Sequence, residues 1–192
     1  MSSAIIDVQF GDKELTASAF TQLKPAGEGR SIILSFIGKV KQSAYHWMHK
    51  RSKGYRCNGD GCPACAAGIT QSWSAVALAA AYLGKGSVQI GYVPLSRPAY
   101  KDVSKLNGGR PKECNVKLTS VGSGFAFESD SGPARWTQDA AMRKAVETAQ
   151  NDTRINALLE SKLYEQLTNA EWERVLAGKS AKELVPEGWE NE

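Results

Sequence analysis

Three of the chain's four cysteines lie within nine residues of one another, and this cluster constrains the local fold more than any other feature. Cys57, Cys62 and Cys65 follow the spacing C-x4-C-x2-C. Two thiolates separated by two residues reach one ion at the tip of a tight turn. The glycines of the intervening GDG sequence permit the backbone angles that such a turn requires. Residues 57–65 therefore predict a metal-binding knuckle.

The fourth ligand is predicted to be a histidine, because three thiolates leave one corner of a tetrahedron free. His46 and His49 both precede the cysteines. We favour His46, since a more distant ligand leaves a longer and less strained return through the basic segment KRSKGYR, and His49 is the alternative. A Cys3His set suits one Zn²⁺ ion. The site would be structural, because no position remains for water.

Other uses of the cysteines fit the sequence less well. Redox dithiols also contain C-x2-C, but they require neither a third cysteine nor nearby histidines. Buried cysteines without a metal are a further alternative, and Cys114 is expected to be an ordinary strand residue. Zinc deaminases place a glutamate two residues after their histidine. Met48 and Arg51 stand at those positions here, so no enzymatic activity is predicted.

Positive charge is concentrated in the middle of the chain. Residues 46–117 contain eleven basic and three acidic residues, whereas residues 1–45 contain five and four, and residues 118–192 contain eight and thirteen. A field of this kind attracts polyanions, of which nucleic acid is the commonest partner for a cytoplasmic protein. Solvated surface lysines are the alternative interpretation.

The composition, with 42% hydrophobic and 23% charged residues, is that of an ordinary folded protein. The longest apolar run, residues 75–83, is about half of the ~20 residues that a membrane helix needs. The first residues show no basic region followed by an apolar one, so no secretion signal is expected. These features favour a soluble protein in a reducing cytoplasm, without a membrane partner.

The hydrophobic pattern predicts a β domain followed by helices. Alternating or β-branched runs predict strands at residues 4–10, 30–40, 87–95 and 113–129. Residues 95–113, with two prolines and paired glycines, predict a long loop. After residue 140 apolar residues are spaced three and four apart, which predicts helices at residues 140–150, 153–167 and 170–178, the last preceded by a capping box at Thr168. The fold class is thus mainly β with C-terminal helices, an α+β protein.

Taken together, the histidine, the basic segment, the CPAC sequence and the later CNVKLTSVGSGFAF segment resemble the zinc-containing single-stranded DNA-binding proteins of tailed phages. The resemblance implies an OB-fold-like barrel with an inserted zinc subdomain at about residues 46–68. It also implies that residues 183–192, a short tail with four glutamates and no basic residue, contact replication or recombination proteins. The expected domains are residues 1–133 for the β domain, 134–182 for the helices and 183–192 for the tail.

Basic and aromatic residues are interleaved, as in proteins that hold single strands by charge and by stacking. Each aromatic residue, taken alone, has a place in a hydrophobic core as its alternative. The candidate nucleic-acid-binding residues are Tyr45, Trp47, Lys50, Arg51, Lys53, Tyr55, Arg56, Tyr92, Arg97, Tyr100, Lys101, Lys105, Arg110 and Lys112. The predicted function is sequence-independent binding of single-stranded DNA in replication, recombination or repair. A zinc-ribbon module that binds proteins, a transcription accessory factor and an RNA-binding protein are the alternatives.

Overall fold

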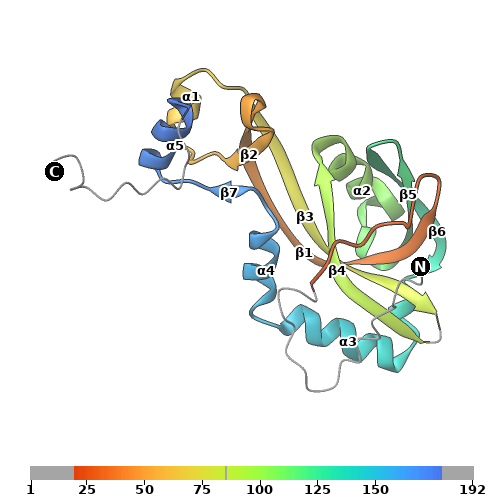
Figure 1. Cartoon of the computed structure of the whole chain (residues 1–192). Coiled ribbons are helices and arrows are strands. Elements are labelled where there is room, and N and C mark those ends of the chain that lie inside the picture. Colours follow the sequence, from red (N-terminus) through yellow and green to blue (C-terminus); the bar gives the residue numbers. More distant parts are fainter. Residues whose placement is uncertain (1–19, 85, 179–192) are drawn as a thin grey trace, which may run out of the picture. The chain divides into compact units, whose positions relative to one another are not determined.

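The computed structural model describes residues 20–84 and 86–178, which form two compact units (Figure 1). We call them the sheet unit, from Met1–Gln42 and Ala75–Lys162, and the cysteine unit, from Ser43–Ser74 and Leu163–Glu192. Both units combine segments that are distant in the sequence. This division differs from the three consecutive segments that the sequence led us to expect.

Among its described residues, the sheet unit has five strands with the order β4-β3-β1-β5-β6. Their bounds are Ser31–Met48 for β1, Gln71–Gly84 for β3, Ser87–Ser96 for β4, Cys114–Val121 for β5 and Gly124–Pro133 for β6. β5 runs antiparallel to both β1 and β6, so that Leu118 lies opposite Ile32 on one side and Phe127 on the other. The predicted combination of an antiparallel sheet with helices is therefore confirmed.

In the sheet unit, β3 is a strand for which the sequence predicted no element. All seven residues from Ala75 to Ala81 are buried, and five of them are alanines. Because successive side chains of a strand point to opposite faces, burial of the whole run means that both faces of β3 are covered. Its hydrogen-bonded neighbours in the sheet are β1 and β4. Small side chains let this central strand fit between covering layers.

The sheet is not closed into a barrel among the described strands, so the OB-like barrel expected from the resemblance is not confirmed. The outer edge of β4 is instead occupied by the chain that leads into the sheet. Leu23 donates its backbone N–H to the carbonyl of Tyr92, and Tyr92 donates to the carbonyl of Thr21. These bonds use the backbone groups of β4 that a closing strand would need.

The predicted loop at residues 95–113 is wrong for most of its length, since helix α2 spans Arg97–Gly109. Ser96 caps the helix, because its side chain accepts a hydrogen bond from the backbone N–H of Ala99. Val103 is buried and anchors the helix to the sheet unit. Prolines and glycines favoured a loop in the sequence, but Pro98 lies in the first turn of the helix, Pro111 follows the helix, and the glycines lie at its end, where the backbone of Leu106, Asn107 and Gly108 is not helical.

Up to residue 178, where the described part of the chain ends, three helices follow the sheet strands. They are α3 (Ala140–Asn151) and α4 (Ile155–Ser161) in the sheet unit and α5 (Asn169–Leu176) in the cysteine unit. The predicted capping box is confirmed, because the side chain of Thr168 accepts from the N–H of Glu171 and the carboxylate of Glu171 accepts from the N–H of Thr168. The helix expected at residues 153–167 is shorter than predicted and is followed by strand β7 (Glu165–Gln166).

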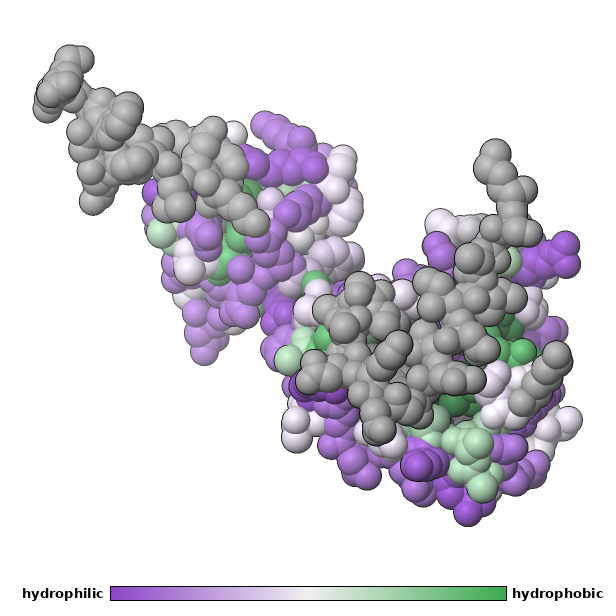
Figure 2. Space-filling model, turned by 60° about the horizontal axis from the view of Figure 1, so that its bottom comes forward, coloured by the Kyte–Doolittle hydropathy of each residue, from purple (hydrophilic) through white to green (hydrophobic). Residues whose placement is uncertain are grey.

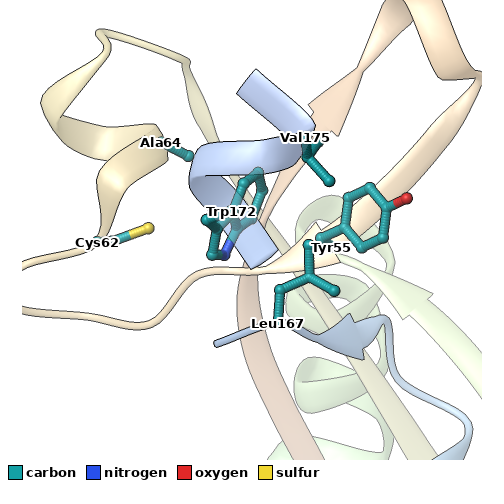
Figure 3. Packing of buried hydrophobic residues seen from close by; sticks show 6 residues of the cluster. All are labelled: Tyr55, Cys62, Ala64, Leu167, Trp172 and Val175. Carbon is teal, nitrogen blue, oxygen red and sulfur yellow. The ribbon is translucent and has the colours of Figure 1, made fainter. Parts of the chain in front are cut away.

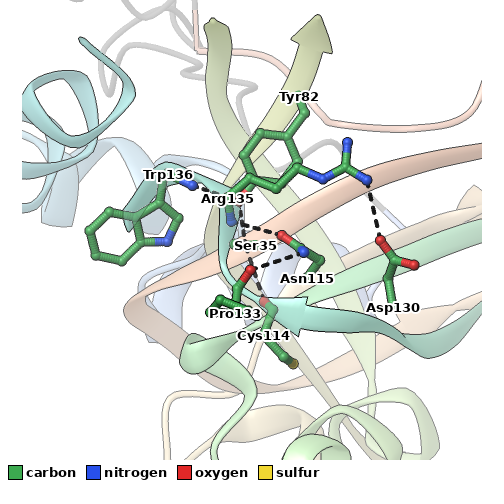
Figure 4. Close-up of polar contacts among 8 residues, drawn as sticks. All are labelled: Ser35, Tyr82, Cys114, Asn115, Asp130, Pro133, Arg135 and Trp136. Carbon is green, nitrogen blue, oxygen red and sulfur yellow. Dashed lines mark hydrogen bonds and ion pairs between the residues drawn. The ribbon is translucent and has the colours of Figure 1, made fainter. Parts of the chain in front are cut away.

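A buried polar network joins the end of β6 to the rest of the sheet unit (Figure 4). The hydroxyl of Ser35 lies 2.7 Å from that of Tyr82. Asn115 donates its side-chain amide to the carbonyl of Pro133, and its side-chain oxygen accepts from the backbone N–H of Arg135. These bonds fix the short 3₁₀ turn η3 (Arg135–Thr137), which leads from the sheet to α3.

The cysteine unit is built on the hairpin of β1 and β2 (Lys53–Arg56), joined by the 3₁₀ turn η1 (His49–Arg51). The register places Trp47 opposite Gly54. A Cβ atom on Gly54 would lie 2.6 Å from the ring of Tyr164, so only glycine fits beside that ring. β7 pairs with β2 in parallel, and this pairing attaches the C-terminal segment to the hairpin.

On the face shown in Figure 2, hydrophilic residues cover much of the described surface of both units. Within residues 20–84 and 86–178, no helix combines the length and the apolar character needed to span a membrane. The strand predicted at residues 4–10 and the acidic tail predicted at residues 183–192 lie outside the described residues.

Candidate metal centre

Four side chains of the cysteine unit converge on one point. The ligand atoms of His46, Cys57, Cys62 and Cys65 all lie within 4.8 Å of one another, and together they could hold a metal ion. His46 comes from β1, and Cys57 directly follows β2. Cys62 is the N-cap residue of the short helix α1 (Pro63–Ala66), and Cys65 lies within that helix. These are the four residues that the spacing predicted as a set of ligands.

Three separations among the ligand atoms are close to those of a tetrahedral site. The Sγ atoms of Cys57 and Cys65 are 3.6 Å apart. Nε2 of His46 lies 3.6 Å from Sγ of Cys62 and 3.4 Å from Sγ of Cys65. Bond lengths of about 2.3 Å to sulfur and 2.0–2.1 Å to nitrogen give tetrahedral edges of roughly 3.8 Å and 3.6 Å. A sulfur–sulfur disulfide bond, at about 2.05 Å, is far shorter than the observed distance.

Neighbouring polar groups orient the ligands. Nδ1 of His46 lies 3.0 Å from the carbonyl oxygen of Ile69, and donation of a hydrogen bond there leaves Nε2 directed at the sulfur atoms. Gln71 donates its side-chain amide to Sγ of Cys57 at 3.2 Å, and the backbone N–H of Gly59 donates to the same sulfur at 3.4 Å. Such contacts stabilise a thiolate and hold its direction.

The electrostatics of the cluster favour a bound cation. Burial tends to raise the pKa of Cys62, but hydrogen bonds from the backbone N–H groups of Asn58, Cys65 and Ala64 lower it to about 6. The hydrogen bond with Cys57 and burial raise the pKa of Cys65 to about 11. Without a cation, the site therefore ionises one thiol readily and resists ionising another. A bound metal ion would offset the repulsion between neighbouring negatively charged thiolates, because its positive charge stabilises all of them together.

His49, the alternative ligand, does not belong to the group of converging side chains. It lies exposed in η1, beyond the end of β1. His46 is fully buried, and its ring meets that of Trp172 edge-on, with 5.7 Å between the ring centroids. His46 is therefore the fourth candidate ligand in place of His49, because its side chain points from β1 into the cysteine cluster.

A hydrophobic cluster supports the centre from one side (Figure 3). Trp172 of α5 is fully buried and contacts the ring of Tyr55 edge-on, with 5.6 Å between the centroids. The same cluster includes the ligand Cys62. Tyr55 is therefore a core residue. The sequence led us to expect its ring on the nucleic-acid-binding surface, but the ring is buried and not accessible to a base.

The other aromatic candidates of the hairpin lie nearer the surface. Trp47 is 38% exposed. Tyr45 is half-buried and stacks on Tyr164, with 4.0 Å between the ring centroids. Trp47 meets Tyr164 edge-on at 6.5 Å. The hairpin thus carries a small aromatic surface with Trp47 as its most accessible member.

The basic candidates of the cysteine unit differ in their surroundings. Lys50 and Lys53 are exposed, and Lys53 forms an ion pair of 2.8 Å with Glu165. Arg51 and Arg56 are half-buried, and Arg56 donates a hydrogen bond to the backbone carbonyl of Tyr164. Arg56 therefore holds β7 against the hairpin, which is a structural role.

The remaining candidates belong to the sheet unit. Arg97, Tyr100, Lys101 and Lys105 are exposed on α2, and Arg110 and Lys112 are exposed after it. Residues four apart lie on the same face of a helix, so Arg97, Lys101 and Lys105 form one basic stripe. Tyr92 is half-buried in β4, where its ring packs against Phe20.

Sequence reasoning missed three residues that shape this site. They are Gln71, Tyr164 and Trp172, which contact a ligand sulfur, the hairpin rings and His46, respectively. Trp172 lies in the helix that the capping box predicted, but no local pattern indicates that this helix returns to a segment more than a hundred residues earlier.

Comparisons of the chain with protein-family models, with curated proteins and with solved structures found no match.

Proposed function

We propose that this protein binds single-stranded DNA without sequence preference, and that one structural Zn²⁺ ion holds part of its binding surface. Three thiolates and one imidazole suit zinc, and four protein ligands leave no position for a reacting water molecule. The metal would act by stabilising the hairpin of β1 and β2, and no catalytic step is assigned to it.

The observation that carries the proposal is the arrangement of neighbouring residues on β1. His46 points into the metal centre and is fully buried, whereas Trp47, the next residue, points out and is 38% exposed. Alternation along a strand produces this arrangement directly. The exposed Lys50 follows in the turn of the same hairpin, whereas Lys53 alternates to the opposite face, where it pairs with Glu165. An accessible aromatic ring near a cation is the kind of surface that binds single-stranded nucleic acid.

The sheet unit supports the proposal through its charge. The stripe of Arg97, Lys101 and Lys105 on α2 offers three cations on one helix face. Each phosphate contact on a single strand contributes about −0.7 to the slope of affinity against salt concentration on logarithmic axes. Binding by such surfaces is therefore expected to weaken as salt is added.

The strand order supports a relation to the OB-fold. In that five-stranded Greek-key barrel, the second and third strands and the loop between the first and second strands bind nucleic acid. The sheet order β4-β3-β1-β5-β6, with α2 between β4 and β5, has the connectivity of such a barrel before its outer strands pair. On this assignment, the binding strands are β3 and β4, and the loop is the segment of residues 49–70 that contains the cysteines.

A titration of fluorescent oligo(dT) at two salt concentrations, with duplex DNA as competitor, tests the proposal. We expect salt-sensitive binding with a preference for single strands. Trp47→Ala should weaken binding by about 1–3 kcal/mol, the contribution of one stacked base. Trp47→Phe, the matched control, keeps a ring and should retain most of the affinity.

Other outcomes of this titration assign the protein to other classes. If neither single-stranded nor duplex DNA binds, the proposal is wrong and the chain is better explained as a zinc module that binds proteins. If RNA of the same length binds more tightly than DNA, the alternative RNA-binding function replaces it. Metal analysis of the same preparation tests the assignment of one zinc ion per chain.

A further inference from the structure

A cavity of about 280 Å³ lies within the sheet unit, between α2 and strands β1, β3 and β4. Its apolar surface includes Leu78, Leu95 and Val103. Tyr100 and Val40 also line the cavity, and they are 38% and 44% exposed. The cavity therefore combines a buried apolar floor with an accessible rim that carries an aromatic ring.

The polar groups of the cavity are cationic or neutral. Lys112 lines it, and Nζ of Lys112 lies 3.4 Å from the position that a Cβ atom on Gly38 would occupy. Because Gly38 has no side chain, the ammonium group comes close to the backbone of β1 at the cavity wall. The hydroxyl of Ser104 belongs to the lining as well. Among the described residues that line the cavity, none is acidic.

The helix that forms one wall carries further cations. Arg97 and Lys101 are exposed on α2 outside the cavity lining, and Arg110, which follows the helix, forms an ion pair of 3.3 Å with Glu113. A ligand that fits here needs a flat apolar part for the cavity and an anionic part for the basic rim. Pockets for drug-sized ligands measure about 300–1,000 Å³. The observed volume is just below this range and suits a smaller ligand.

We propose that this cavity binds one nucleotide unit of a single strand, with the base between Tyr100 and the apolar floor and the phosphate at Lys112. The inference rests on the proposed function and adds to it a defined position for one unstacked base, separate from the hairpin of the cysteine unit. Sequence-independent binding is retained, because the described lining is mainly apolar and every base has an apolar face.

Ser104→Trp is the variant that closes the cavity. Ser104 is exposed, and its hydroxyl donates only to the carbonyl of Lys101 in its own helix, so its replacement removes no buried contact. Thr148→Trp on α3 is the matched control, because Thr148 is also exposed and its hydroxyl donates to the carbonyl of Lys144 in the same way. Both variants add one large side chain to a helix surface.

The first measurement follows the backbone amide signals of the full chain by NMR during addition of dTMP. We expect dTMP to shift the signals of Val103, Ser104 and Lys112 in the wild type and in Thr148→Trp, but not in Ser104→Trp. The second measurement is affinity for oligo(dT). Ser104→Trp should weaken it about 5- to 150-fold, the effect of one lost stacking contact. Lys112→Gln should make the dependence of oligo(dT) affinity on salt less steep, reducing the magnitude of the logarithmic slope by about 0.7.

Several results would overturn the inference. If dTMP leaves the cavity signals unchanged, or if Ser104→Trp binds oligo(dT) as tightly as Thr148→Trp, the cavity does not hold a nucleotide. Shifts caused by inorganic phosphate alone would reduce the site to an anion contact at Lys112. Shifts caused by indole but not by dTMP would point to an apolar side chain of a partner protein. Failure of oligo(dT) to bind the wild type at all would instead reject the proposed function. The dTMP titration would still show whether the cavity binds a nucleotide.

Discussion

Removal of the metal ion should unfold the cysteine unit and leave the sheet unit folded. The buried hydrophobic cluster of the cysteine unit contains six residues, of which Trp172 is the largest. Truncation of a buried Trp to Ala costs about 3–5 kcal/mol. A structural zinc ion contributes about 10–16 kcal/mol in small zinc-binding peptides at pH 7. Chelation should therefore destabilise the cysteine unit more than Trp172→Ala does.

Cys62→Ser produces the same perturbation without a chelator. The matched control is Cys114→Ser, because Cys114 is also buried but belongs to the sheet unit and lies outside the ligand cluster. Metal analysis should give one zinc ion per chain for the wild type and for the control, and a loss of zinc for Cys62→Ser. In the NMR spectrum of that variant, amide signals of residues 43–74 and 163–178 should collapse, while those of residues 86–133 persist.

Two results would refute this reasoning. One is a metal-free chain whose amide signals in the cysteine unit remain dispersed and protected. The other is a larger loss of thermal stability in zinc-loaded Trp172→Ala than in the chelated wild type. In either case, hydrophobic packing rather than the metal ion would be the main source of stability in the cysteine unit.

Three further predictions follow from single contacts. Gln71→Leu removes a hydrogen bond to the sulfur of Cys57 and should lower metal affinity about 10- to 100-fold, as measured by competition with a chelator. An unchanged affinity would show that this hydrogen bond is not needed for metal binding. Gly54→Ala places a Cβ atom 2.6 Å from the ring of Tyr164 and should destabilise the cysteine unit by about 1–3 kcal/mol in thermal melts, whereas a stable variant would mean that the ring moves freely. The hydrogen bond from Arg154 lowers the pKa of Asp152 below 3.8. The ionised Asp152 carboxylate therefore stabilises the folded state above pH 3.8, and this stabilisation is lost as the pH falls through the lowered pKa of the folded protein. Asp152→Asn should flatten this part of the acid-unfolding curve, and an identical curve would contradict it.

The cysteine spacing and the helix signals were readable because they are local. Cys57, Cys62 and Cys65 are close in the sequence, and a turn of this length brings its thiolates together whatever the rest of the chain does. The capping box at Thr168 also acts within a few residues, and helix α5 begins where it predicts. Regular alternation likewise predicted strand structure at residues 87–95 and 113–129, where β4, β5 and β6 lie.

Helix α2 shows where composition misleads. Two prolines and paired glycines in residues 95–113 indicated a loop. The structure places Pro98 in the first helical turn, Pro111 after the helix and the glycines at the helix end, where the backbone is no longer helical from Leu106 to Gly108, so the regular turns lie between Arg97 and Lys105. Burial of Val103 against the sheet unit then supplies the packing that stabilises a helix of this length.

By itself, the sequence indicated the three cysteines of the knuckle with His46 or His49 as the fourth candidate ligand, the presence of strands followed by helices, and the concentration of positive charge. The tertiary structure decided that an alanine-rich run becomes the central strand β3, that Tyr55 is a core residue while Trp47 stays accessible, and that Trp172 returns to the metal centre. These outcomes depend on which surfaces meet across long stretches of chain. A residue's exposure is a property of its neighbours in space, and no local pattern contains them.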